Sequence, residues 1–207
     1  MLMTVLLVSS RLTGGPANPG CLFSLEAEGM SEGWSDCMAI ALRIKSNDTR
    51  ASSYPIGEWA QDITNGIRPW LYSTSMSTNP LTCASVNAMV DGHQVGNVWG
   101  NMLYEILWNL IDKHGNTNEP GPTFDHGVPN DGKYLTMKLV IDGMALQPCT
   151  PNFLQARDAI LDADTVLTNG SNHRDIWKGF AKRGLGQGCI YSAQNRIDNF
   201  NVPTGIC

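Results

Sequence analysis

Two carboxylates stand four residues apart in the segment 29–36, GMSEGWSD, whose other residues are small or apolar. In a helix, Glu32 and Asp36 would lie one turn apart on the same face, where two like charges repel each other. A divalent cation would remove the repulsion. Glu32 is therefore a candidate zinc ligand, and Asp36 a candidate acceptor of a hydrogen bond from a zinc-bound imidazole. The alternative is a helix edge whose charges are neutralised by Arg43 or Arg11.

Two further residues have side chains suited to catalysis. Arg68 stands in a long polar segment, and His93 stands near the start of the longest helical pattern. Arginine and histidine can both donate hydrogen bonds to an oxygen that becomes negative during a reaction. Each also has a plainer interpretation, which is a salt bridge between loop and core for Arg68 and a satisfied core or helix-start histidine for His93.

The carboxylate pair falls in a helical pattern over residues 29–44, with apolar residues on both sides. A helix that is apolar all round is buried. Burial of Glu32 and Asp36 is costly unless they are paired or bind a metal. One apolar stripe comprises Met30, Trp34, Cys37, Met38 and Ala41.

A second, longer helix is predicted over residues 85–112, after a polar loop at residues 46–79 that is long enough to be functional. Glycines at four-residue spacing, Gly92, Gly96 and Gly100, permit another backbone to approach this helix closely. Its apolar stripe comprises Val95, Val98, Trp99, Met102, Leu103, Ile106 and Leu110.

Three more helices follow a surface connection at residues 115–131. The patterns predict helices at 133–146 and at 153–167, the latter with Thr150 as its cap and Pro151 in its first position. The last helix begins after Ser171 or Asn172 and ends at Gly184. No strand pattern stands out, so the fold class is mainly α.

The composition describes one globular domain of 207 residues, with 42% hydrophobic and 16% charged residues. A net charge of −5 without a basic run argues against nucleic acid or anionic lipid as a partner. No segment has the roughly 18 consecutive apolar residues that a membrane span needs. We interpret the apolar residues 1–8, MLMTVLLV, as the start of a core segment and not as a secretion signal, because no basic residue precedes them.

Six cysteines are spread along the chain without a CxxC pair, which excludes a cysteine-based zinc site. Two N-glycosylation sequons begin at Asn47 and Asn169. Together with the low charge, these features favour a secreted, extracellular glycoprotein. Cys149 and Cys189 flank the last two predicted helices, so they could pair in a disulfide.

Seven blocks follow one another along the chain: SSRLTGGPANPGCL, GMSEGWSDCMAIALR, YPIGEWA, IRPWLYSTSMSTNP, WGNMLYEILWNLIDKHG, DGKYLTMKLVIDGMALQPCTPNFLQARDAILDAD and IWKGFAKRGLG. In this order they resemble the C-terminal half of the fungalysins, secreted fungal zinc metalloendopeptidases with a thermolysin-like catalytic domain. The resemblance covers residues 9–188, with 1–8 as a divergent start and 189–207 as a tail. It implies the C-terminal helical lobe of a thermolysin-like zincin metallopeptidase.

The resemblance also implies roles for the four candidate residues. Glu32 matches the third zinc ligand, Asp36 the carboxylate behind a zinc-bound histidine, His93 the histidine that stabilises the oxyanion, and Arg68 the arginine that binds a substrate carbonyl. The implied reaction is hydrolysis of peptide bonds in proteins by zinc-activated water. The implied partners are protein or peptide substrates and the chain's own propeptide, so that the enzyme is made as a zymogen and acts as a monomer.

The chain departs from the family where a zincin needs the motif H-E-x-x-H. The two histidines should fall at Leu2 and Leu6 and the glutamate at Met3, and none is present. We therefore expect that this chain alone neither binds zinc tightly nor cleaves peptide bonds. One hypothesis is a metalloendopeptidase whose sequence starts late through a gene-model or splicing accident. The other is a truncated paralogue that binds peptides or a propeptide without cutting. A lobe without its partner should also expose an apolar face and be poorly soluble.

Overall fold

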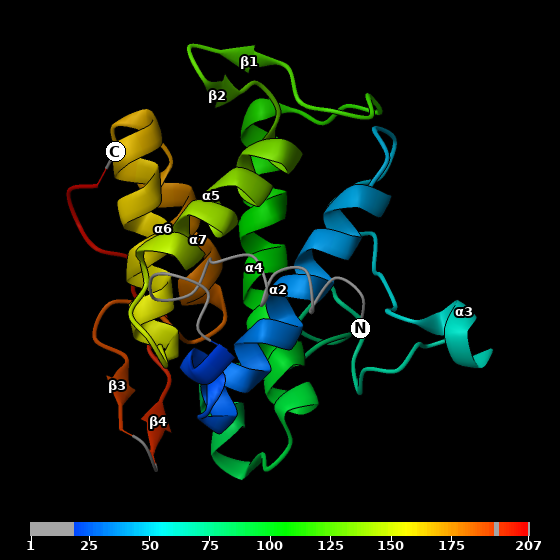
Figure 1. Cartoon of the computed structure of the whole chain (residues 1–207), viewed down its shortest axis with the longest axis vertical. Helices are drawn as coiled ribbons and strands as arrows, with labels where there is room; N and C mark the ends of the chain where they lie inside the picture. Colours follow the sequence, from blue (N-terminus) through cyan, green and yellow to red (C-terminus); the bar gives the residue numbers. More distant parts are fainter. Residues whose placement is uncertain (1–18, 193–194, 207) are drawn as a thin grey trace.

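The computed structural model describes residues 19–192 and 195–206, in which helices are joined by loops (Figure 1). The helices are η1 (Pro19–Leu22), α2 (Leu25–Arg43), α3 (Glu58–Gln61), η2 (Cys83–Ala88), α4 (Gly92–His114), α5 (Gly132–Leu146), α6 (Phe153–Thr168) and α7 (His173–Lys182). Four two-residue strands complete the fold: β1 (Phe124–Asp125), β2 (Val128–Pro129), β3 (Ile190–Tyr191) and β4 (Arg196–Ile197). The prediction of a mainly α fold is confirmed.

Helix α4 is the centre of the core. Helices α2, α5 and α7 all pack against it, and α6 packs on α5 and α7 (Figure 1). The ring of Trp99 lies 5.0 Å from that of Phe153, 5.7 Å from that of Phe180 and 6.4 Å from that of Trp34, measured between centroids. The two apolar stripes predicted for α2 and α4 are buried in full. One aromatic ring of α4 therefore joins helices from both ends of the chain.

Helices α2 and α4 approach each other through glycines. A Cβ atom added at Gly33 would lie 2.7 Å from the backbone nitrogen of Gly100 and 2.7 Å from the carbonyl oxygen of Gly96. A Cβ added at Gly96 would lie 2.7 Å from the Cβ of Glu32. The close approach expected from the spacing of Gly96 and Gly100 is thus observed. It brings the carboxylates of α2 next to the first turns of α4.

Replacing Gly33 with alanine should force the two helices apart, because the obstructing atoms belong to the backbone. We expect the free energy of unfolding to fall by about 1–2 kcal/mol, as overpacking outweighs the better helix propensity of alanine. Urea denaturation measures this change. The matched control is Gly121→Ala, where a Cβ meets nothing within 4 Å. Equal stability of the two variants would contradict the close contact.

The predicted helix at residues 85–112 is wrong at its start. Residues Cys83–Ala88 form the separate 3-10 helix η2, and α4 begins at Gly92. Met89 and Asp91 both have extended backbone angles, and the Asp91 side chain accepts a hydrogen bond from the backbone N–H of His93 at 3.1 Å. An aspartate in this position caps a new helix and interrupts the earlier pattern.

The predicted start of α6 is also corrected. Asn152, not Thr150, is the cap, because its side chain accepts from Gln155 N–H while the Gln155 side chain accepts from Asn152 N–H. Thr150 has a φ of 52° and precedes the helix. Of the two residues predicted to precede α7, Ser171 and Asn172, the structure has Asn172 in that position. Gly184 has the positive φ of 82° expected just beyond the end of the helix.

The tail takes part in the fold. Strands β3 and β4 form an antiparallel hairpin that packs against η2, and β1 and β2 form another hairpin in the connection between α4 and α5. Such short strands leave no alternating pattern in the sequence.

Residues 1–18, with Arg11 and the positions Leu2, Met3 and Leu6, lie outside the described residues. Among the helices that the structure does describe, none has the length and apolar character of a membrane span.

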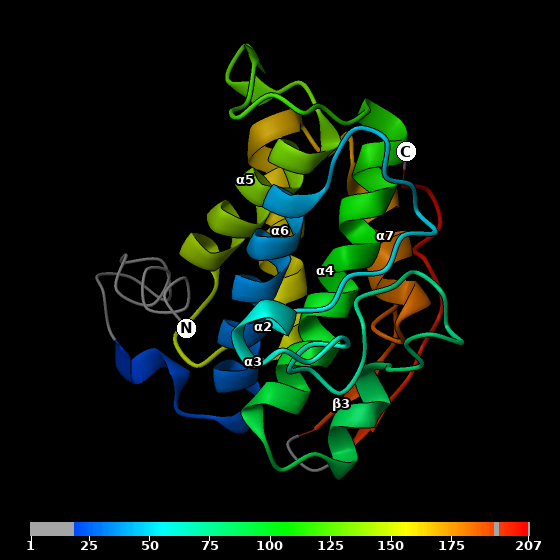
Figure 2. The same cartoon turned by 90° about the vertical axis from the view of Figure 1, so that its right-hand side faces the viewer.

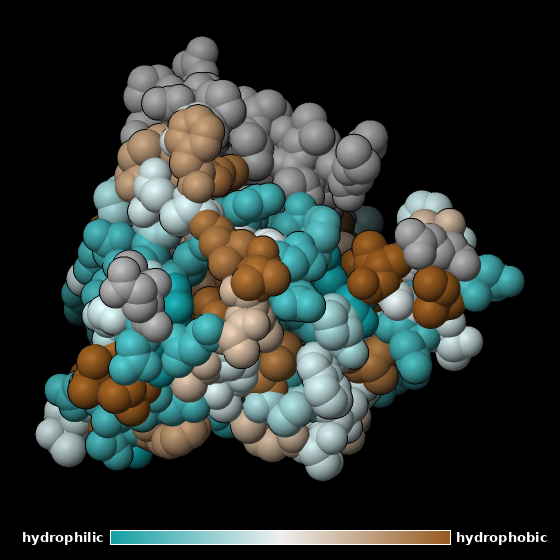
Figure 3. Space-filling model, turned by 90° about the horizontal axis from the view of Figure 1, so that it is seen from below, coloured by the Kyte–Doolittle hydropathy of each residue, from teal (hydrophilic) through white to brown (hydrophobic). Residues whose placement is uncertain are grey.

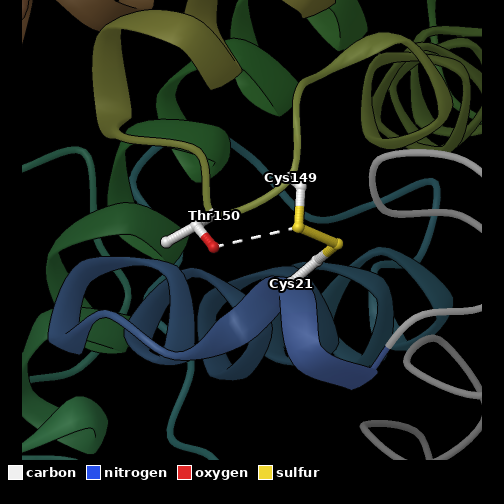
Figure 4. Close-up of a disulfide and its surroundings, with 3 residues drawn as sticks. All are labelled: Cys21, Cys149 and Thr150. Atoms are coloured by element: carbon white, nitrogen blue, oxygen red, sulfur yellow. Dashed lines mark hydrogen bonds between the residues drawn. A yellow bond between two sulfur atoms is a disulfide. The ribbon is translucent and has the colours of Figure 1, made fainter.

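A disulfide joins Cys21 in η1 to Cys149 before α6 (Figure 4). The expected pairing of Cys149 with Cys189 is therefore wrong. The backbone N–H of Thr150 donates to the carbonyl of Cys21 at 3.0 Å, which holds the two segments side by side. Cys189 instead lies in the segment before β3, beside Cys83. Contact between Cys21 and Cys149 depends on tertiary packing across 128 residues, which sequence spacing cannot reveal.

Candidate functional site

The loop between α2 and η2 carries Arg68 and crosses the face formed by α2 and α4 (Figure 2). Two buried asparagines of α4 hold it there. Asn97 accepts from the backbone N–H of Trp70 at 3.0 Å and donates to its carbonyl at 3.1 Å. Asn101 makes the same pair of bonds with Ser73, at 3.0 and 3.3 Å. Each asparagine side chain thus supplies the backbone of the loop with one hydrogen-bond acceptor and one donor, as the backbone of a neighbouring strand would.

A buried ion pair fixes the other end of this loop. Glu105 of α4 and Arg183 after α7 are both fully buried, with 2.7 Å between Arg183 Nη2 and Glu105 Oε1. Arg183 also donates to the carbonyl of Ser73 at 2.6 Å and to the carbonyl of Asn79. Lys182 adds a contact to Glu105 at 2.9 Å. The sequence analysis missed this cluster, although a glutamate inside an apolar helix face was a signal.

Arg68 lies between the two carboxylates of α2. Its Nε donates to Asp36 Oδ2 at 2.6 Å and its Nη2 donates to Asp36 Oδ1 at 3.0 Å, so the salt bridge is bidentate. The same Nη2 donates to Glu32 Oε2 at 2.8 Å. The side chains of Arg68 and Asp36 are 5% and 6% exposed, and that of Glu32 is 23% exposed. The cation that neutralises the carboxylate pair in this chain is therefore Arg68.

His93 completes the group from the first turn of α4. Its Nδ1 lies 3.0 Å from Arg68 Nη1 and 3.4 Å from Glu32 Oε2. A guanidinium has no acceptor, so in the bond to Arg68 the histidine Nδ1 accepts. The ring proton is then on Nε2, and the side chain is 63% exposed. In this arrangement the Nε2–H is the remaining donor of the ring, beside a buried cation.

All four predicted site residues therefore come together in space. The interpretation of Arg68 as a salt bridge between loop and core is confirmed by its bonds to Asp36. The alternative in which Arg43 neutralises the carboxylates is wrong, because Arg43 pairs with Glu58 at 2.6 Å. The plainer interpretation of His93 holds in one of its two forms: His93 is a helix-start histidine, in the first turn of α4, and not a core histidine.

Tyr72 lies behind this group and donates its hydroxyl hydrogen to Asp36. Burial, and next the negative charge of Asp36, raise the pKa of Tyr72 well above its usual value. Tyr72 was not identified from the sequence. It gives Asp36 a second donor residue, because Oδ2 accepts from Tyr72 as well as from Arg68, while Oδ1 accepts from Arg68.

The raised pKa of Tyr72 makes stability depend on pH in the alkaline range. The folded state keeps the hydroxyl neutral, whereas the unfolded tyrosine ionises near pH 10, at about its ordinary pKa. The stabilisation is thus fully present below about pH 10 and is lost as the pH rises toward the folded pKa. The urea midpoint should fall as the pH rises above about 10, and Tyr72→Phe should make this fall smaller. The rest of the fall comes from other tyrosines with raised pKa values, such as Tyr54 and Tyr104. A curve of unchanged slope in this variant would contradict the assignment.

The described residues do not form a metal site by themselves. No group of three or more histidine, cysteine, aspartate or glutamate side chains within residues 19–192 and 195–206 has the geometry to hold an ion. Glu32 accepts a bond from Arg68 at Oε2, and Asp36 accepts bonds from both Arg68 and Tyr72. A zinc ion would need two or three ligands besides Glu32. The donor set in this part of the chain therefore does not fit a complete zinc centre.

Several apolar side chains of the Arg68 loop are exposed. They are Trp59, Ile63, Ile67, Trp70 and Met76. Seen from below, hydrophobic side chains lie in separate patches between hydrophilic ones (Figure 3). On that side, at least, they do not form one continuous apolar surface.

The family comparison places the chain in a class of protein, the metallopeptidases. The family model for the fungalysin metallopeptidases (M36) matches residues 7–189. The chain belongs to this family, and its mainly α fold is that expected of the C-terminal lobe of a fungalysin.

Several curated relatives are similar over almost the whole chain. The extracellular metalloproteinase MEP of Neosartorya fischeri is 62% identical over 200 residues, which are 97% of this chain and 32% of the relative. The extracellular metalloproteinase of Aspergillus fumigatus gives the same values, and that of Leptosphaeria maculans is 60% identical over 201 residues. The chain thus spans 32% of the length of these relatives.

Proposed function

We propose that this chain is the C-terminal part of the catalytic domain of an extracellular zinc metalloendopeptidase. The observation that carries the proposal is the convergence of Glu32, Asp36, Arg68 and His93 from two helices and a long loop. In this proposal Glu32 is the carboxylate that this part supplies to zinc. Asp36 orients a zinc-bound histidine, and His93 and Arg68 hold the oxygen of the scissile or neighbouring carbonyl.

The geometry supports a carbonyl-binding role for His93 and Arg68. The Nε2–H of His93 is the remaining donor of the ring because Nδ1 accepts from Arg68. The guanidinium adds positive charge 3.0 Å from the ring, which favours negative charge on an oxygen bound at Nε2. The chain's residues therefore offer donors for a developing oxyanion, while zinc would supply the activated water.

Family membership also supports the remaining parts of the proposal. The relatives are named extracellular metalloproteinases, and the disulfide and the exposed sequon residues Asn47 and Asn169 suit an oxidising, extracellular setting. We propose protein substrates, activation by removal of a propeptide, and action as a monomer.

By itself the 207-residue chain should bind zinc weakly and leave casein intact, since Glu32 is a lone ligand without H-E-x-x-H. A hybrid tests the site. An upstream fungalysin segment, chosen because it carries the zincin motif H-E-x-x-H, is fused to this chain. The hybrid should hydrolyse casein, and a chelator should abolish the activity.

In the hybrid, Glu32→Gln should lower casein hydrolysis at least about 100-fold, and Asp36→Asn about 10- to 100-fold. The matched control is Glu28→Gln, an exposed glutamate one turn earlier on α2. Full activity of the Glu32→Gln hybrid would show that Glu32 is not a ligand. A folded hybrid that binds casein peptides without cleaving them would favour the alternative function, a non-catalytic lobe that binds peptides or a propeptide.

A further inference from the structure

We propose that Cys83 and Cys189 form a disulfide in addition to Cys21–Cys149. Their sulfur atoms lie 3.9 Å apart although 106 residues separate them in the chain. Cys83, at the start of η2, is fully buried, and Cys189, before β3, is partly buried. Among the described residues, no third cysteine sulfur contacts either of these two. This modification does not depend on the proposed function.

Separate hydrogen bonds hold the two segments together around the sulfur atoms. Cys83 N–H donates to the carbonyl of Arg183 at 2.8 Å, and Ala84 N–H donates to Asp198 Oδ1 at 2.7 Å. Asn87 donates to the carbonyl of Arg196 at 2.8 Å and accepts from its N–H at 2.9 Å. The proximity of the sulfur atoms is therefore a consequence of the fold and exists before any bond forms.

Closing the bond requires the sulfur atoms to approach to about 2.05 Å. We assign this movement to the segment of Cys189. It follows the sequence Gly186–Gln187–Gly188, in which Gly188 has a φ of 86°, and Gln187 and Gly188 are exposed. A change of side-chain rotamer with a small shift of this turn brings the Cys189 sulfur toward Cys83, while η2 stays in place.

The oxidant is a low-molecular-weight disulfide such as oxidised glutathione. The thiolate of Cys189, the more accessible of the two, attacks it, forms a mixed disulfide and releases one glutathione thiolate. The thiolate of Cys83 then attacks the Cys189 sulfur and releases the second glutathione thiolate. Two cysteine thiols are oxidised, one glutathione disulfide is reduced, and the two cysteine protons end on the two glutathione molecules.

The bond would join the C-terminal segment covalently to η2, which directly precedes the start of α4. The first turn of α4 carries His93. Cys37 provides a contrast, because it is fully buried in α2 and lies in no such pair. Burial raises the pKa of the thiols of both Cys37 and Cys83, so acidity does not distinguish them. What distinguishes Cys37 is that no second thiol among the described residues contacts it. Cys37 should therefore stay reduced and unreactive in the folded chain.

Peptide mapping by mass spectrometry tests the proposal on the full chain. The protein is incubated with oxidised glutathione, free thiols are blocked with an alkylating reagent in denaturant, and the digest is analysed without reduction. We expect a cross-linked peptide containing Cys83 and Cys189, two hydrogen atoms lighter than the sum of its parts, and an alkylated Cys37. Alkylated Cys83 and Cys189, or a cross-link from Cys189 to Cys207, would overturn the proposal.

Thermal unfolding gives a second measurement, with Cys37→Ala as the matched control. Oxidised wild type should unfold about 5–10 °C above oxidised Cys189→Ala. After full reduction the difference between wild type and Cys189→Ala should shrink to a few degrees, because only packing then differs. The difference in unfolding temperature between wild type and Cys37→Ala should be the same in oxidised and reduced protein. A gap for Cys189→Ala that does not change on reduction would contradict the bond.

Discussion

Replacing Arg183 with methionine should lower the free energy of unfolding by about 3–5 kcal/mol, because it removes one partner of a buried ion pair. Glu105 is fully buried and would keep Lys182 at 2.9 Å and Arg50 at 3.9 Å, both of them partly exposed. The carbonyls of Ser73 and Asn79 would lose their donor as well. Urea denaturation of the full chain measures the loss.

The matched control for Arg183→Met is Arg43→Met, which breaks a partly exposed pair with Glu58. Such pairs contribute about 0–1 kcal/mol. The two variants should therefore differ by at least about 2 kcal/mol. If they lost the same amount, burial of the Glu105–Arg183 pair would not be what stabilises the loop. Faster proteolysis of the loop in Arg183→Met would locate the effect.

Replacing Arg68 with methionine should lower the free energy of unfolding by about 3 kcal/mol, since Asp36 is buried and would keep only the hydroxyl of Tyr72. Glu32 is partly exposed and contributes less to this loss. Arg174, which is exposed, gives a control in Arg174→Met with an expected change within about 0.5 kcal/mol.

A double variant separates charge from packing in this prediction. Adding Asp36→Asn to Arg68→Met should recover part of the stability, because no unpaired buried charge remains at that position. We expect a coupling energy of about 1–3 kcal/mol between the two substitutions. Strictly additive losses would show that Arg68 stabilises the chain through its alkyl stem and not through its charge.

The sequence predicted the parts of the fold that depend on local periodicity. The stripes of α2 and α4 and the glycine spacing of α4 each follow from residues a few positions apart, and the structure confirms them. The break at Asp91 was missed because apolar residues continue across it, and the cap of α6 was missed because Thr150 and Asn152 are both suitable cap residues. Local chemistry alone did not choose between them.

The residues of the candidate site were predicted, but the hydrogen bonds between them were not. Resemblance to the family named Glu32, Asp36, Arg68 and His93, and residue types alone could not show that Arg68 would reach both carboxylates. Tyr72, Asn97 and Glu105 were missed because their partners lie on other elements. Contacts of this kind are set by tertiary packing, and a single sequence does not record them.

The Cys21–Cys149 disulfide closes a covalent ring that contains α2, α4 and α5. The exposed connection between α4 and α5, with its β1–β2 hairpin, lies inside this ring. A single proteolytic nick there would open the ring without separating the two fragments, which would stay linked until a reductant is added. Cleavage at this exposed connection would thus leave the helices covalently linked.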